Sequence, residues 1–308
     1  MSGSHSVVRN KRLRMILLNY ELYLFLLPII VLSILFKYVP MYGLQIAFKN
    51  FIPSRGIWGS SWTGLENFAR FFRSSLSWIY IKNTFFISLY SLVAGFLPPI
   101  ILALLLNSLR NQKYKRVLQT VTYLPHFISV VVMAGMIVLF LSPRGLWGNI
   151  AGFLGVEKLN IMALTGTFKH VYVWSGVWQS MGWGSIIYLS ALSAVDVELY
   201  EAATIDGANK IQKIWYIDIP TIAPTIIILL ILNTGGLLSV GFQKAYLLQN
   251  NLNLMESEVI ATYTYKMGLI NAQYSFGAAV GLMNTSVNFI ILIVVNRIAR
   301  AVTNMSIW

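Results

Sequence analysis

The stretch Tyr200–Pro224 reads YEAATIDGANKIQKIWYIDIPTIAP and is the longest polar interruption in the C-terminal half of this 308-residue chain. Asp196, just before it, is a residue type that caps helix N-termini by accepting a backbone N–H. Gly207 allows a tight turn after the helix that follows. A second amphipathic helix, 211–219, is expected to end at Pro220, because proline removes a helical hydrogen bond. The stretch therefore predicts two short helices and a turn, lying in water between two apolar runs.

The composition is that of an integral membrane protein. The chain is 57% hydrophobic and 11% charged, whereas about a quarter of the residues of soluble domains are charged. It has no cysteine, which excludes disulfides, zinc–thiolate sites, iron–sulfur clusters and thiol catalysis. The net charge is +13, but the cations flank apolar runs and form no stripe with interleaved aromatic residues. This distribution predicts anchoring at a membrane surface and no binding of nucleic acid.

Six apolar runs are long enough for the ~20 residues that a membrane-spanning helix needs. They are Leu22–Val39, Thr84–Leu106, Thr122–Leu141, Val171–Leu192, Ile222–Val240 and Gly277–Val295. The predicted fold class is therefore an all-α integral membrane protein with six transmembrane helices. The first run is no cleavable signal, because no small-residue cleavage site follows it.

The basic residues predict the orientation of these spans. The clusters Arg9–Arg14 and Arg110–Arg116 lie in short segments next to spans, and such clusters favour the cytoplasmic side. Both termini and the loop around Glu201 are therefore predicted to be cytoplasmic. The predicted organisation is a leader (1–20), a first span with an extracytoplasmic segment (21–82), a five-helix core (83–298) that includes the loop 196–224, and a tail (299–308).

The acidic residues exclude several functions. In this interpretation none of the ten acidic residues lies inside a span, whereas an ion-coupled carrier usually needs an intramembrane carboxylate. The three histidines are too scattered along the sequence for a metal site. The chain lacks the pattern G-x-x-x-x-G-K-[ST], so it does not bind ATP through a P-loop. The sequence predicts no catalytic residue, no metal and no cofactor bound by this chain.

The polar loop resembles the EAA loop of binding-protein-dependent ABC transporter permeases. The matching residues are Glu201, Ala202, Ala203, Asp206, Gly207, Ala208, Ile217, Pro220 and Pro224. Four further segments occur in the order seen in sugar-type permeases: VPMYGLQIAFKNF, TGLENFARFF, IKNTFFISL and YLPHFIS. The first is most similar to the LplB-like permeases of oligosaccharide and polysaccharide uptake, to which alginate-transporter permeases are also similar. One departure is Val197, since many relatives place a proline at or next to this position.

The resemblance implies a type I ABC importer permease fold in which this loop is the coupling helix, docked into a groove of an ATPase subunit. The coupling residues are then Glu201, Ala202, Ala203, Asp206, Gly207 and Pro220. The implied partners are a second homologous permease subunit, usually different in the sugar group, two ATPase subunits that hold ATP and Mg, and an extracytoplasmic solute-binding protein. The implied substrate is an oligosaccharide, and the implied location is the bacterial plasma (inner) membrane.

Polar and aromatic residues inside the predicted spans are candidates for the substrate pathway, because polar groups there are costly unless they are partnered or line water. The candidates are Trp174, Trp178, Gln179, Tyr188, Asn233, Asn284 and Asn288. The alternatives are an interfacial aromatic belt for the tryptophans and hydrogen bonds between helices for the asparagines.

The segment Gln249–Ala272 is predicted to be an external loop that contacts the binding protein or closes an external gate. Its candidate contact residues are Glu256, Glu258, Tyr263 and Tyr265. A merely solvated loop is the alternative.

Three other functions stay open on the sequence: an importer permease for a non-sugar solute, an ion-coupled carrier and a membrane-embedded glycosyl transferase. The last two are disfavoured by the scarcity of acidic residues in the spans. The charge of the sugar is not determined, although a uronate polymer would need a cationic cavity and most cations flank spans.

Overall fold

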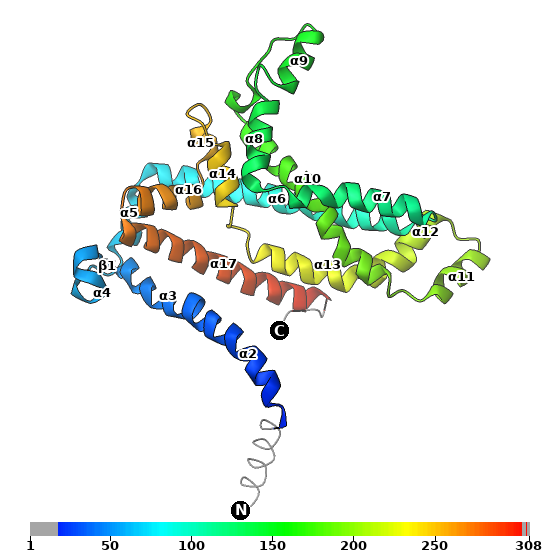
Figure 1. Ribbon diagram of the computed structural model, residues 1–308, viewed down its shortest axis with the longest axis horizontal. Coiled ribbons are helices and arrows are strands. Elements are labelled where there is room, and N and C mark those ends of the chain that lie inside the picture. Colours follow the sequence, from blue (N-terminus) through cyan, green and yellow to red (C-terminus); the bar gives the residue numbers. More distant parts are fainter. Residues whose placement is uncertain (1–17, 304–305, 307–308) are drawn as a thin grey trace, which may run out of the picture.

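The structure is a computed structural model that describes residues 18–303 and 306, and this part of the chain is almost entirely helical (Figure 1). The strands within it are β1, Lys49–Asn50, and β2, Ser61–Trp62, which pair antiparallel. The all-α prediction is confirmed. Most of the predicted leader and the end of the predicted tail lie outside the described residues.

Helices follow one another along the described chain with short connections. The α-helices are α2 Tyr20–Ser33, α3 Val39–Met41, α4 Gly56–Gly59, α5 Glu66–Arg73, α6 Ser75–Asn107, α7 Gln112–Tyr123, α8 Val130–Phe140, α9 Leu146–Phe153, α10 Thr167–Leu192, α11 Val197–Ile205, α12 Lys210–Lys213, α13 Ile219–Thr234, α14 Phe242–Leu248, α15 Leu254–Ser257, α16 Ile260–Tyr265 and α17 Tyr274–Thr303. The 3₁₀-helices are η2 Tyr42–Phe48, η3 Pro53–Arg55, η4 Leu124–Phe127 and η5 Ile161–Ala163, and the π-helices are η1 Ile34–Tyr38, η6 Ile214–Asp218 and η7 Lys266–Ile270.

Four helices of the described part are long and apolar enough to cross a membrane. They are Tyr20–Phe48, Ser75–Asn107, Lys210–Thr234 and Tyr274–Val302, and a bent pair, Gln112–Phe127 with Val130–Phe140, makes five if it is one span. α10 has 26 residues, enough to cross a bilayer, but its polar side chains keep it out of this apolar set. The predicted count of six is therefore not confirmed, although each predicted span overlaps one of these helices.

The third predicted span, Thr122–Leu141, is not one continuous helix. The axis bends by 96° between Phe127 and Val130. Pro125 begins the short helix η4 before the bend, and Ser129 is extended and caps α8 by accepting a hydrogen bond from the Val132 amide at 3.3 Å. The apolar run is therefore bent, because a new helix with its own cap begins inside it.

The fifth predicted span, Ile222–Val240, differs from the observed helix at both ends, and this helix runs through Pro220. The π-helical turn η6 widens the helix directly before Pro220, and a helix widened in this way accommodates the proline ring and its missing N–H. The helix therefore continues without a break from Lys210 to Thr234. It then stops at Gly235 and Gly236, so the residues up to Val240 are not helical as predicted.

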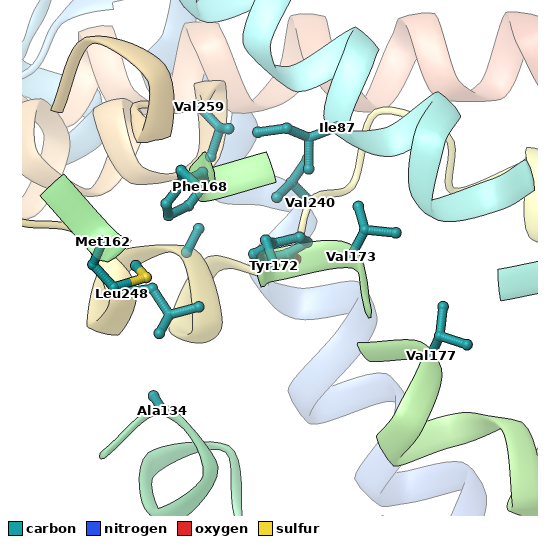
Figure 2. Packing of buried hydrophobic residues seen from close by; sticks show 11 residues of the cluster. Ile87, Ala134, Met162, Phe168, Tyr172, Val173, Val177, Val240, Leu248 and Val259 are labelled. Carbon is teal, nitrogen blue, oxygen red and sulfur yellow. The ribbon is translucent and has the colours of Figure 1, made fainter. Parts of the chain in front are cut away.

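The principal core lies where α10 packs along α6 and against the segment after α13. Phe168, Tyr172 and Val173 of α10 belong to one buried cluster with Ile87 of α6 and Val240 (Figure 2). By contrast, the apolar window of the Tyr20–Phe48 helix is 0% buried within this chain. Its surface is therefore available to lipid or to another subunit.

The predicted external loop Gln249–Ala272 is mostly helical. It contains α15, α16 and η7, and α16 and η7 pack against α17. A backbone contact between Gly268 and Gly277 is so close that a Cβ on Gly277 would lie 2.7 Å from the Gly268 Cα. The segment is therefore part of the packed structure and not a merely solvated loop.

Candidate functional site

The loop around Glu201 forms the predicted helix–turn–helix. α11 begins after Asp196, whose side chain accepts a hydrogen bond from the Glu198 amide at 3.0 Å. Gly207 has φ +77°, the left-handed conformation that glycine adopts without strain. The Ala208 amide donates to the Ala203 carbonyl at 2.8 Å, and the Gly207 amide to that of Thr204 at 3.1 Å. These two bonds form a Schellman cap, which ends α11 sharply.

The second helix of the loop starts with a capping box. The Gln212 amide donates to the Asn209 side chain at 2.9 Å, and the Asn209 amide donates to the Gln212 side chain at 2.8 Å. Both backbone donors are thereby satisfied at the start of α12. The shape of the loop follows from bonds between residues at most five positions apart.

A buried tyrosine–aspartate contact fastens α11 to the rest of the molecule. The Tyr200 hydroxyl donates to the Asp218 carboxylate, which is 3% exposed, and accepts a bond from the Asn107 amide group at 3.3 Å. Burial, and then the bond to Asp218, raise the pKa of Tyr200 to about 12. Tyr200 therefore stays protonated, and remains a donor, at neutral pH.

Lys213 links the two helices of the loop. Its ammonium donates to the Thr204 hydroxyl at 2.6 Å and to the Tyr200 carbonyl at 3.4 Å. The sequence prediction overlooked Tyr200, Lys213 and Asp218. The available signal was the spacing of Tyr200 and Thr204, which are four residues apart and so share one face of α11.

The residues that the resemblance assigns to coupling lie mostly on the outer surface of this loop. Glu201, Ala202, Asp206, Gly207 and Pro220 are exposed, and Ala203 is half-buried. The Glu201 side chain makes no hydrogen bond or ion pair with another residue of the described part. Ile205 and Ile211, on either side of the turn, are 86% and 66% exposed. An exposed apolar patch beside free acidic groups is typical of a surface that binds another protein.

A polar cavity lies between α6, α10 and the segment 235–240. Its volume is about 290 Å³. The lining residues are Ser88, Ser91, Leu92, Gly95, Phe96, Tyr172, Ser180, Asn233, Gly236, Leu237, Ser239 and Val240. Hydroxyl and amide groups thus meet inside the helical core.

Two of these lining residues have unsatisfied hydroxyls. The side-chain oxygens of Ser88 and Ser91 are buried and have no hydrogen-bond partner in the described part of the chain. A buried hydroxyl without a partner is costly, so these groups are available to water or to a hydroxylated ligand. They are three residues apart on α6, a spacing that places both on one helix face and that the sequence prediction overlooked.

A second cavity of about 320 Å³ adjoins the first and shares Ser91, Gly95, Tyr172 and Ser180 with it. Gln179 and Lys244 also line this second cavity. Lys244 lies on α14 and is 8% exposed, and its ammonium donates to the Tyr172 carbonyl at 2.5 Å. In the sequence Lys244 follows the fifth predicted span, and the structure places it in the core.

Two of the predicted pathway residues line these cavities. Asn233 lines the first, and Gln179 lines the second. Gln179 also donates a hydrogen bond to the Ile128 carbonyl at 2.8 Å, which ties α10 to the bend before α8. Asn233 is exposed at the end of α13.

The tryptophans of the pathway prediction lie on the outer side of α10. Trp174 and Trp178 are 54% and 45% exposed, and neither lines these two cavities. The Trp174 indole donates to the Tyr90 hydroxyl at 2.8 Å. Tyr188, by contrast, is 3% exposed in an apolar cluster with Ile100 and Ile222, away from both cavities.

Asn284 and Asn288 hold the segment that follows α13. Asn288 accepts from the Leu238 amide at 2.8 Å and donates to the Ser239 hydroxyl at 3.2 Å. Asn284 donates to the Leu238 carbonyl at 3.2 Å. Their four-residue spacing does put them on one face of α17, and that face clamps the wall of the first cavity.

The candidate binding-protein contacts have internal partners. Glu256 accepts from the Gly166 amide with both carboxylate oxygens, at 2.8 and 2.6 Å, at the start of α10. Glu258 is 4% exposed and pairs with Lys266 at 2.5 Å. Tyr263 packs against Phe71 and Phe276, and Tyr265 against Phe242 and Tyr246. Of these four side chains, Glu258 is too buried to contact a partner in this conformation.

Comparison with known proteins decides the family. Residues 99–304 match the model of the binding-protein-dependent transport system inner membrane component. The chain belongs to this family. The permease is thus a multi-pass membrane subunit of a binding-protein-dependent transport system.

The permease is similar to curated proteins along nearly its whole length. It is 40% identical over 294 residues to the polygalacturonan/rhamnogalacturonan transport system permease protein YteP of Bacillus subtilis (strain 168), covering 95% of this chain and 92% of that protein. It is 39% identical over 280 residues to protein LplB of the same organism, covering 91% and 88%.

The fold of the permease matches solved structures of one kind of transporter. A chain of a bacterial ABC transporter involved in the import of the acidic polysaccharide alginate superposes with a TM-score of 0.87 at 37% identity, covering 95% of this chain and 99% of that one. A bacterial alginate ABC transporter in complex with alginate pentasaccharide-bound periplasmic protein gives 0.86 at 37% identity, covering 96% and 99%. The type I ABC importer permease fold that the resemblance implied is confirmed.

Proposed function

We propose that this permease forms half of the translocation pathway of an ATP-driven importer for oligosaccharides or polysaccharides. The observation that carries the pathway is the pair of unpartnered hydroxyls, Ser88 and Ser91, in a cavity bordered by amide and hydroxyl groups. A saccharide offers hydroxyl donors and acceptors that satisfy such groups. The names of the similar proteins, which concern polygalacturonan/rhamnogalacturonan and the acidic polysaccharide alginate, support a saccharide.

The loop that carries Glu201 is proposed to transmit the work of ATP hydrolysis. It presents exposed Glu201, Ile205 and Ile211 on a surface whose shape is fixed by caps at both helices. Tyr200 and Lys213 brace the same loop to the long helix that leads into α13. A displacement of α11 by the ATPase would therefore also move the helix Lys210–Thr234. In this proposal ATP and Mg are bound by separate ATPase subunits.

The proposed assembly contains a second, homologous permease subunit, two ATPase subunits and an extracytoplasmic solute-binding protein. The apolar window of the helix Tyr20–Phe48 supports a partner in the membrane, because none of its residues is buried within this chain. The proposed orientation places both termini and the Glu201 loop in the cytoplasm.

Affinity purification from the native membrane with mass spectrometry of the co-eluting proteins tests this function. We expect an ABC ATPase and a second permease with the wild-type chain, and at least a tenfold loss of ATPase with Glu201→Ala/Gly207→Val. Glu157→Ala/Gly155→Val is the matched control, because Glu157 is also exposed and Gly155 also has a positive φ, +71°. Absence of any ATPase from the wild-type preparation would contradict the proposal.

Measurements of saccharide uptake test the proposal that the cavity belongs to the translocation pathway. Ser88→Ala/Ser91→Ala is expected to lower saccharide uptake at least fivefold without changing the amount of assembled complex. Ser286→Ala is the control, since this exposed serine only bonds the Leu282 carbonyl of its own helix. Equal uptake by both variants would show that the saccharide does not pass through this cavity.

A further inference from the structure

Lys244 is a cation placed inside the helical core beside a polar cavity. It extends from α14 towards α10, and only 8% of the residue is exposed. Its ammonium lies 4.6 Å from the centre of the Tyr172 ring and donates to the Tyr172 carbonyl. It is the only charged residue among those that line the two adjoining cavities.

No carboxylate of the described residues neutralises this charge. The ion pair found in that part of the chain joins Lys266 to Glu258, and no acidic residue lies within ion-pair distance of Lys244. Burying a charge without an opposite charge is costly. Burial lowers the pKa of Lys244 to about 8, so the side chain still carries its proton at pH 7.

The surroundings leave room for the ammonium and for a ligand. An ammonium has three N–H donors, and the Tyr172 carbonyl accepts one of them. Gly176 faces the ammonium so closely that a Cβ there would lie 3.1 Å from the Lys244 Nζ. The glycine thus permits the buried position. Gln179 and the unpartnered Ser91 hydroxyl line the same cavity.

We propose that Lys244 binds a carboxylate of the transported saccharide, so that the pathway selects uronate-bearing oligosaccharides over neutral ones. This inference rests on the proposed function and adds the charge of the substrate to it. A carboxylate supplies the opposite charge that the cavity lacks, and Ser91 and Gln179, which line the same cavity as Lys244, are placed to bond the hydroxyls of the sugar. The sequence indicates that most cations flank spans, and Lys244 is a cation that the structure places beside the cavity.

A purely structural role is the competing explanation. In that case Lys244 only anchors α14 to α10 through the Tyr172 carbonyl. Lys244→Arg keeps the charge and a donor, whereas Lys244→Met keeps the length and loses both. Gly176→Ala leaves Lys244 in place but presses on its ammonium. Lys82→Met removes one charge at an exposed position of α6 and serves as the control.

The test is direct binding to the assembled transporter in nanodiscs, without the solute-binding protein, so that the selectivity of that protein does not enter. The probes are trisaccharides of galacturonate, glucuronate, mannuronate and guluronate, each with its methyl ester, which lacks the negative charge and carries a methyl group in its place. Kd is measured for wild type, Lys244→Met, Lys244→Arg, Gly176→Ala and Lys82→Met. The thermal midpoint of each complex reports its folding.

We expect wild type to bind at least one uronate roughly tenfold tighter than its ester. Lys244→Met should weaken uronate binding roughly 10- to 100-fold, as expected for a charge-assisted hydrogen bond, and change ester binding less than twofold. Lys244→Arg should retain the preference for the acid, Gly176→Ala should reduce it, and Lys82→Met should not change it.

Three outcomes would overturn the inference. Equal wild-type affinity for acids and esters, or unchanged acid binding by Lys244→Met, would exclude a carboxylate at this position. An equal loss of acid and ester binding in Lys244→Met, with a lowered thermal midpoint, would assign Lys244 a structural role only. If wild type bound no saccharide of either kind, this inference would fail, whereas the proposed function is tested separately by uptake through the whole assembly.

Discussion

The Tyr200 hydroxyl donates a hydrogen bond to the Asp218 carboxylate and thereby joins the exposed helix α11 to the long helix that contains α13. The two residues are 18 positions apart, and Asp218 is buried. This bond connects the surface proposed to meet the ATPase with a helix whose end borders the cavity.

Removal of this hydroxyl should loosen the loop. Tyr200→Phe leaves the buried Asp218 carboxylate without its tyrosine donor, which costs about 1–3 kcal/mol. We expect a lower thermal midpoint of the purified complex and ATP hydrolysis that is less dependent on the binding protein. Tyr216→Phe is the control, because Tyr216 is 80% exposed. An unchanged midpoint and unchanged ATPase stimulation would remove Tyr200 from the coupling route.

The same bond predicts a pH dependence. The pKa of Tyr200 is raised from 10.0 to about 12 in the folded protein, so its stabilising contribution is complete below pH 10 and is lost as the pH rises through 12. The difference in stability between wild type and Tyr200→Phe should therefore be constant from pH 6 to pH 9. If denaturant titration showed that this difference shrinks between pH 6 and pH 9, the Tyr200 hydroxyl would not stay protonated as stated.

Gly207 is expected to act through its backbone conformation alone. Its φ is +77°, and no atom lies within 4 Å of the position that a Cβ would occupy. Gly207→Val should therefore cost about 1–2 kcal/mol through the left-handed conformation and reduce uptake, whereas Gly207→Asn should be tolerated. Uptake at the wild-type rate by stably inserted Gly207→Val would argue against a defined turn at this position.

Asn288 should matter for the wall of the cavity. Asn288→Leu removes the acceptor of the Leu238 amide and the donor to the exposed Ser239 hydroxyl, and the half-buried amide left without a partner costs about 1–3 kcal/mol. We expect a lower thermal midpoint and a several-fold loss of saccharide uptake. Ser286→Ala on the same helix should leave both unchanged. A stable Asn288→Leu complex with full uptake would show that the clamp is dispensable.

Glu258 should behave as a structural residue. Glu258→Ala leaves Lys266, which is 29% exposed at its side chain, without its carboxylate partner, although Gln249 still accepts from its ammonium at 3.0 Å; the loss should be at most on the order of 3 kcal/mol. The double variant Glu258→Ala/Lys266→Met should recover much of this loss in a chemical denaturation series. A binding-protein contact would give the opposite pattern, with normal stability, weaker docking and no recovery in the double variant.

The polar loop shows why part of the site was predictable. The Asp196 cap, the Gly207 turn and the helices on either side depend on hydrogen bonds between residues at most five positions apart. Local bonds of this kind are encoded in a short stretch of sequence. The second helix was predicted to end at Pro220, but it continues into α13. The π-helical turn η6 directly before the proline accommodates it, so the helix is not interrupted there.

The cavity shows the limit of such reasoning. The sequence by itself determined the helical membrane class, the approximate spans and the turn at Gly207, because apolar run length and local caps are properties of neighbouring residues. Only the tertiary structure decided that Lys244 lies against Tyr172, that Glu258 is buried and that Asn288 holds Leu238. Lys244 and Tyr172 are 72 positions apart, and Asn288 and Leu238 are 50 apart. Glu258 pairs with Lys266, 8 positions away, and its burial depends on the helices around it. Burial and charge pairing depend on which helices meet, and that information is spread over the whole chain.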